Sequence, residues 1–111
     1  MTVELIEGSA FKRRYLLQDE AGVALNLTGA LSVGIFMYQT GNATAIFIKT
    51  AANGGLVVIG APSAGLVEIT LSGADTEDKA GHYNGEARVT LSDSTPLKRA
   101  VDNWIITAAE G

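Results

Sequence analysis

Two stretches of the chain alternate apolar and polar residues with a period of two. On one side of residues 66–72 lie the branched apolar residues Val67, Ile69 and Leu71. In residues 83–91 the apolar positions are Tyr83, Ala87, Val89 and Leu91. A period of two is typical of strands with one face in the core and the other in solvent. Both stretches are therefore predicted to be half-buried antiparallel strands.

Other segments are apolar on both sides. We expect strands over residues 2–7, 10–18, 31–39, 44–49 and 56–61, and a last strand around the run Trp104, Ile105 and Ile106. Turn residues separate them, and residues 40–42 and 53–55 are predicted to be hairpins because Asn and Gly tolerate positive φ. Short strands at regular spacing predict an antiparallel β-sandwich of seven to nine strands.

Residues 73–79 are the exception to the β pattern. They contain no β-branched run, and their acidic residues suit the first turn of a helix. We expect one short helical turn here, joining two strands of an otherwise all-β fold.

Composition limits the classes of function. The chain has 111 residues, 47% of them apolar, which predicts a single folded domain over residues 1–111. It has no cysteine, which excludes disulfides and thiolate sites, and its net charge is −4. A nucleic-acid binder usually carries a basic stripe, so we expect no nucleic-acid partner. The N-terminus does not have the pattern of a signal peptide, and no apolar stretch approaches membrane-spanning length.

The few chemically reactive residues do not form a recognisable motif. His82 is the only histidine, no nucleophile motif precedes it, and we expect it to face solvent or pack in a turn. An acidic group, Asp75, Glu77 and Asp78, lacks the spacing of a calcium loop. Glu68 and Glu86 could act as a carboxylate pair only if they faced each other across a cleft. We therefore predict no catalytic residue, no metal and no cofactor.

The basic cluster divides between two faces of its predicted strand. Alternation places Lys12 and Arg14 on one face and Arg13 on the other, beside Phe11 and Tyr15. This split argues against a phosphate-binding patch and leaves Arg13 available to pair with an acid.

An excess of apolar residues is the most informative feature. Several strands lack a clean polar face, and an apolar outer face on a β domain often marks a subunit interface. The alternative is that each sheet and the loops cover these residues. On the first interpretation we expect self-association, with four contact candidates, Phe36, Tyr38, Trp104 and Ile106.

Two groups of short motifs carry a family resemblance. The first is Asp19-Glu-Ala-Gly22 followed by the sequence LNLTGA at residues 25–30, and the second is GLVEITL at residues 65–71 followed by Asp75-Thr76, AGHY at 80–83 and EARVTL at 86–91. In this order they resemble Ig-like β-sandwich domains of tailed-phage virion proteins, including the N-terminal domain of upper baseplate proteins. The resemblance implies an Ig-like fold, docking onto other virion or tail proteins, homo-oligomerisation and no catalysis.

Residues 78–83 are predicted to form a tyrosine corner. In Ig-like sandwiches a tyrosine near the start of a late strand bonds back to upstream backbone through its hydroxyl. Here Asp78 and Gly81 supply the turn and Tyr83 supplies the ring, which alternation places in the core.

The sequence favours a non-enzymatic structural protein of a phage or prophage particle. It would belong to the tail, baseplate or connector region, assemble in the bacterial cytoplasm and reside in the virion. A carbohydrate- or ligand-binding β-module is the alternative. It requires an exposed aromatic platform, for which only Tyr38 and Trp104 are candidates.

Overall fold

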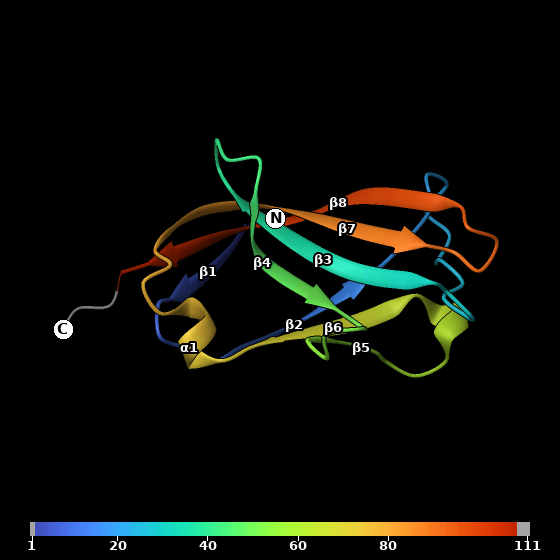
Figure 1. Ribbon diagram of the computed structural model, residues 1–111, viewed down its shortest axis with the longest axis horizontal. Helices are drawn as coiled ribbons and strands as arrows, with labels where there is room; N and C mark the ends of the chain where they lie inside the picture. The colour runs from blue at the N-terminus through green and yellow to red at the C-terminus, as the bar shows by residue number, and fades with distance from the viewer. Residues whose placement is uncertain (1, 109–111) are drawn as a thin grey trace.

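The computed structural model describes residues 2–108 and shows two facing β-sheets (Figure 1). The described residues form eight strands: β1 (Thr2–Ile6), β2 (Phe11–Leu16), β3 (Ser32–Gln39), β4 (Ala45–Thr50), β5 (Leu56–Val58), β6 (Leu66–Leu71), β7 (Gly81–Thr90) and β8 (Pro96–Thr107). A 3₁₀ turn, η1 (Pro62–Ala64), precedes β6, and the short helix α1 (Gly73–Thr76) follows it. The expected all-β fold with a helical turn after residue 72 is confirmed.

The strand order makes this an Ig-like sandwich. One sheet has five strands in the order β1-β8-β7-β3-β4, and the other has three in the order β2-β6-β5. In the immunoglobulin fold, strands B, E and D form one sheet and strands G, F and C the other. The strands β2, β6 and β5 occupy the first set of positions and β8, β7 and β3 the second. Strand β4 lies where variable-type domains add strand C′.

Two pairings differ from the sequence-based expectation. Strand β1 runs parallel to β8, while the other strand pairs are antiparallel. The turn at residues 53–55 does not form a hairpin, because β4 and β5 belong to different sheets. Gly54 does adopt a positive φ of 80°. Asn-Gly therefore correctly indicated a tight turn, but this turn carries the chain from one sheet to the other. The hairpin at residues 40–42 is confirmed, because β3 and β4 pair antiparallel.

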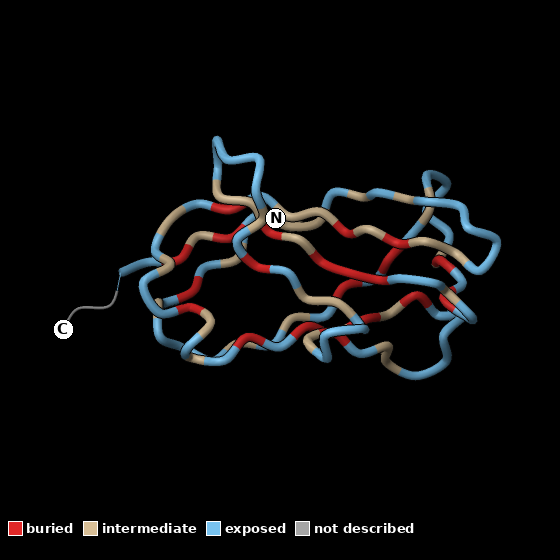
Figure 2. The backbone as a smooth tube through the Cα atoms, viewed as in Figure 1, coloured by how far each residue is buried: buried red, intermediate tan, exposed pale blue. Residues whose placement is uncertain are grey.

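The core lies between the sheets, where buried positions from both layers face each other (Figure 2). Four aromatic rings at its centre are joined by three edge-on or tilted contacts. Phe47 lies 5.2 Å from Tyr83 and 5.7 Å from Trp104, measured between ring centroids. Phe11 from the opposite sheet lies 5.7 Å from Trp104. Trp104 thus joins the two layers.

A β-bulge in β8 decides which of its residues face this core. Asn84 pairs with Asn103 and Glu86 with Ala100, so Val101 and Asp102 together stand opposite Gly85. An extra residue on one strand reverses its side-chain alternation. Beyond the bulge the inward positions are Asp102, Trp104 and Ile106.

Candidate functional site

The outer face of the five-stranded sheet carries a patch of large apolar side chains. Phe36 and Tyr38 on β3 alternate with the buried residues Ile35 and Met37, so they point away from the core, and both are half-buried. On the neighbouring edge strand β4, Ile46 and Ile48 are 39% and 46% exposed. Phe36 stands beside Ile48 in the β3–β4 register. We call these four residues, Phe36, Tyr38, Ile46 and Ile48, the outer-face patch.

Arg88 on β7 fixes the two aromatic rings of the patch. Its guanidinium carbon lies 4.5 Å from the centroid of Phe36 and 5.8 Å from that of Tyr38. Its Nη2 donates to the Tyr38 hydroxyl, and its Nε donates to Glu86 Oε1 at 2.9 Å. The hydrogen bond to Glu86 raises the pKa of Arg88 further above its ordinary value. The patch therefore has ordered rings and an adjacent pair of opposite charges.

A shallow groove of about 230 Å³ continues the patch toward one end of the sheet. Its lining includes Gly34, Phe36, Thr50, Arg88, Pro96 and Lys98. Gly34 allows the Phe36 ring to lie close to the strand, because a Cβ on Gly34 would come within 2.9 Å of Phe36 Cε1. The outer face is thus both apolar and hollowed, with cationic groups beside the hollow.

The structure separates the four contact candidates into two pairs. Phe36 and Tyr38 lie on the outer face, as expected. Trp104 and Ile106 do not, because they are 0% and 2% exposed and belong to the core. This corrects the expectation for those two residues. The run of apolar residues at 104–106 has no alternation to show its facing, and the bulge before it turns Trp104 inward. Tyr38 and Trp104 consequently do not form the aromatic platform that a carbohydrate-binding module requires.

A polar network spans the two sheets beside Trp104. Asp102 Oδ2 accepts hydrogen bonds from Arg13 Nε at 2.8 Å and pairs with Arg13 Nη2 at 2.7 Å. Asp102 Oδ1 accepts from the Tyr15 hydroxyl at 2.7 Å and from Trp104 Nε1 at 3.2 Å. Burial and the bond to Asp102 raise the pKa of Tyr15 far above its ordinary value. These bonds join β2 to β8 and so link the two sheets.

The tyrosine corner is present as predicted. Tyr83 is 2% exposed, and its hydroxyl donates to the Lys79 carbonyl at 2.6 Å. Asp78 turns the chain in the left-handed region with a φ of 58°, and Gly81 has a φ of 151°. Burial raises the pKa of the Tyr83 hydroxyl. Asp78 and Gly81 thus act through the backbone, and Tyr83 ties the start of β7 to the turn after α1.

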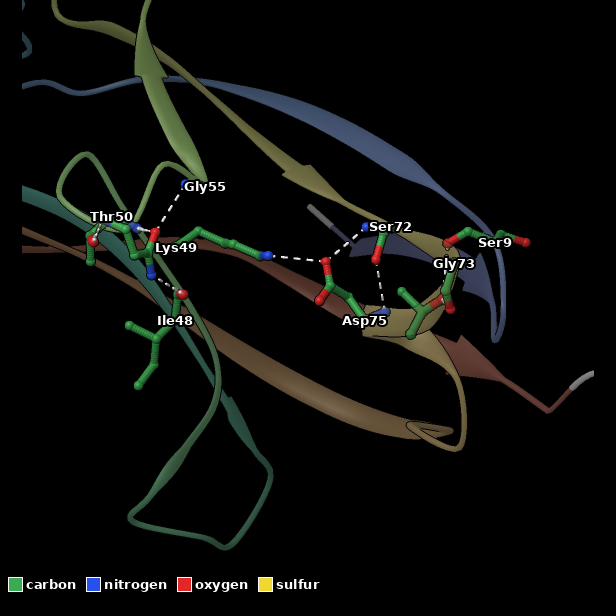
Figure 3. A network of polar contacts seen from close by, with 10 residues as sticks. Ser9, Ile48, Lys49, Thr50, Gly55, Ser72, Gly73 and Asp75 are labelled. Carbon is green, nitrogen blue, oxygen red and sulfur yellow. Dashed lines mark hydrogen bonds and ion pairs between the residues drawn. The ribbon is translucent and has the colours of Figure 1, made fainter.

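A second polar network fastens α1 to the edge strand β4 (Figure 3). Asp75 and Ser72 form a capping box, in which Ser72 Oγ accepts from the Asp75 N–H and Asp75 accepts from the Ser72 N–H. Lys49 Nζ reaches Asp75 Oδ2 at 3.0 Å. The backbone bond from Ser72, followed by the bond from Lys49, lowers the pKa of Asp75. Asp75 is therefore a structural carboxylate that joins α1 to β4.

The remaining candidates for chemistry lie apart. His82 is exposed, as expected, and its backbone carbonyl accepts from Thr40. Glu68 bonds Arg14 on the outer face of the three-stranded sheet, whereas Glu86 lies on the outer face of the other sheet. Across residues 2–108, groups of three or more His, Cys, Asp or Glu that could hold a metal ion do not occur. Over the same residues, neither helical segment has the length and apolar character to cross a membrane.

Comparison with known proteins adds one distant likeness. No family model matches the sequence, and no curated protein matches it at a significant level. Among solved structures, the chain is similar to murine CRIg, with a TM-score of 0.47 and 15% sequence identity. The match covers 98% of this chain and 92% of that one.

Proposed function

We propose that this chain is a non-enzymatic assembly protein of a tailed-phage or prophage particle, and that it docks through the outer-face patch. The observation that carries the docking role is the group of exposed and half-buried apolar residues beside Arg88 and Glu86. The phage setting rests on the sequence resemblance in residues 19–30 and 65–91. The assignment to a tail, baseplate or connector region of the virion has the same basis.

The occupant that best fits the patch is a second copy of the chain. A two-fold interface joins the same surface on both subunits, so the surface must be complementary to itself. Apolar side chains satisfy this requirement because the apolar residues of one copy can pack against the apolar residues of the other. Arg88 and Glu86 satisfy it too, because a two-fold rotation can bring the cation of one copy to the anion of the other. A neighbouring virion protein would then bind elsewhere on the assembled dimer.

The test of the phage setting is the composition of purified particles. Prophage induction in the cell that carries the gene, followed by density-gradient purification, is expected to give particles that contain this chain in a fixed ratio to the major tail proteins. A deletion of the gene is expected to give particles that lack the same substructure in electron micrographs. Intact, infective particles without the chain would contradict the proposal.

A further inference from the structure

Strand β4 ends the five-stranded sheet, and within residues 2–108 no strand pairs with its outer side. Variable-type Ig domains continue the sheet with strand C″ after C′. Here only residues 51–55 separate β4 from β5, and β5 belongs to the other sheet. An edge strand presents unpaired N–H and C=O groups, which form a template for a strand of another chain.

The side chain of Asn53 occupies two of them. Its Nδ2 donates to the Ile48 carbonyl at 3.0 Å, and its Oδ1 accepts from the Thr50 N–H at 3.0 Å. These are the donor and acceptor that a paired strand would otherwise supply. Two further bonds hold the amide in place: the Gly55 N–H donates to Asn53 Oδ1 at 2.9 Å, and the Asn53 N–H donates to Thr50 Oγ1 at 3.0 Å. Figure 3 shows Ile48, Thr50 and Gly55 converging on this loop.

We propose that Asn53 is an autoinhibitory edge residue, whose amide stands in for a ninth strand and prevents β4 from pairing with β4 of a second copy. This goes beyond the proposed docking function, because it concerns the edge of the sheet rather than its outer face. It directs copies of the chain to associate through the face.

The geometry of a β4–β4 pairing shows why the side chain of Asn53 is enough to block it. In an antiparallel pair, every second residue directs both its N–H and its C=O toward the neighbour. Asn53 bonds residues 48 and 50, so the outward groups of the regular part of β4 belong to Ile48 and Thr50. A two-fold β4–β4 contact centred on Ile48 would need the Ile48 carbonyl of both copies as acceptors, and both are already bonded. At the next outward residue along β4, the contact would need the Thr50 N–H as a donor, and that group is already bonded to Asn53 Oδ1.

Two other features restrict the rest of the same edge. The β3–β4 register shifts between Met37 and Tyr38, which leaves Ile46 at an irregular position. Lys49 points its side chain inward to Asp75, and only 18% of that side chain is exposed. Bulges and inward charges are both devices that discourage edge-to-edge pairing. Asn53 is the one that acts on the hydrogen-bonding groups themselves.

The test combines hydrogen exchange with sedimentation across a range of protein concentrations. In Asn53→Ala, the Thr50 amide is expected to exchange at least about tenfold faster than in the parent chain at low concentration. At high concentration the variant is expected to form larger species in which the Thr50 amide is protected again. Association through the outer-face patch would not protect that amide, so the readout separates edge pairing from face pairing. Asn42→Ala, in the loop at the other end of β4, is the matched control and is expected to behave like the parent chain.

A second substitution tests the route of assembly. Thr50→Pro, added to Asn53→Ala, removes the outward N–H without removing a bond to β3, and is expected to abolish the new assembly. The inference is overturned if Asn53→Ala sediments like the parent chain at every concentration, or if Thr50→Pro leaves the new assembly intact. If Asn53→Ala does not fold, Asn53→Ser, whose hydroxyl is too short to reach the Ile48 carbonyl, is measured with the same two outcomes.

Discussion

The guanidinium of Arg13 on β2 meets the carboxylate of Asp102 on β8 at 2.7 Å, and this ion pair joins the two sheets of a sandwich that has no disulfide. The Asp102 side chain is 6% exposed and that of Arg13 is 29% exposed. Antibody domains join their sheets with a disulfide that packs against a buried Trp. Here Trp104 donates to the same carboxylate, so a polar network holds the sheets beside a buried indole.

Replacing Asp102 with Asn is expected to cost roughly 2–4 kcal/mol of unfolding free energy, because it removes the buried negative charge that Arg13, Tyr15 and Trp104 all bond. The matched control is Glu68→Gln, which breaks the exposed pair with Arg14 and is expected to cost less than about 1 kcal/mol. Urea denaturation of the three proteins measures both differences. Equal costs for the two substitutions would show that Asp102 does not fasten the sheets.

Tyr83→Phe keeps the buried ring and removes the hydroxyl that bonds the Lys79 carbonyl. Because a buried acceptor is left unpaired, the unfolding free energy is expected to fall by roughly 1–3 kcal/mol. Tyr38→Phe, on the outer face, is the control and is expected to change the free energy by less than about 1 kcal/mol. Chemical denaturation with an unchanged midpoint and slope for Tyr83→Phe would contradict the tyrosine corner.

Gly85→Ala is expected to destabilise the fold by roughly 1–3 kcal/mol through overpacking. A Cβ at this position would lie 2.4 Å from Val101 Cγ2 and 2.8 Å from the Asp102 carbonyl oxygen, at the bulge that turns Asp102 inward. The emission of Trp104 reports on the same region and is expected to shift with the loss of stability. A variant with parental stability and emission would show that the bulge tolerates a side chain.

The pH dependence of stability is expected to reflect Asp75. The backbone bond from Ser72 and the bond from Lys49 lower the pKa of its carboxyl below the ordinary value of 3.8. A carboxyl of this kind contributes its full stability above the ordinary pKa and loses it as pH falls through the lowered one. At neutral pH, Asp75→Asn is expected to cost less than about 1 kcal/mol, because solvent screens a carboxylate whose side chain is 36% exposed. The difference between variant and parent should shrink below pH 3.8, and thermal unfolding at several pH values measures it. A difference that stays constant with pH would contradict this role.

The sequence predicted the strands well because alternation is a local signal. The period of two in 66–72 and 83–91 located β6 and β7, and with them the buried Tyr83. Asn53-Gly54 located a turn, but the sheet that receives the next strand depends on contacts far along the chain. The parallel pairing of β1 with β8 also depends on residues far apart in the sequence, so the pattern of residues 2–6 does not predict it.

The sequence predicted only some residues of the candidate site, because the facing of the others also depends on the folded sheet. Phe36 and Tyr38 share one face of a strand that is apolar on both sides, and the structure places that face outward, so their choice as contact candidates agrees with their position. Trp104 lies after a bulge, and a bulge reverses alternation without a clear sequence signal. The role of Asn53 was missed because its amide bonds backbone groups three and five residues earlier, on a strand edge that exists only in the folded sheet.

Sedimentation velocity of Ile48→Ser against Val57→Ser is the most direct test of docking through the outer-face patch. The two side chains are similarly exposed, at 46% and 50%, but lie on the outer faces of opposite sheets. Self-association of the parent chain is expected to weaken by at least about tenfold in Ile48→Ser, because the buried apolar area falls, and to remain unchanged in Val57→Ser. A parent chain that stays monomeric at high concentration, or equal effects of the two substitutions, would contradict docking through the outer-face patch.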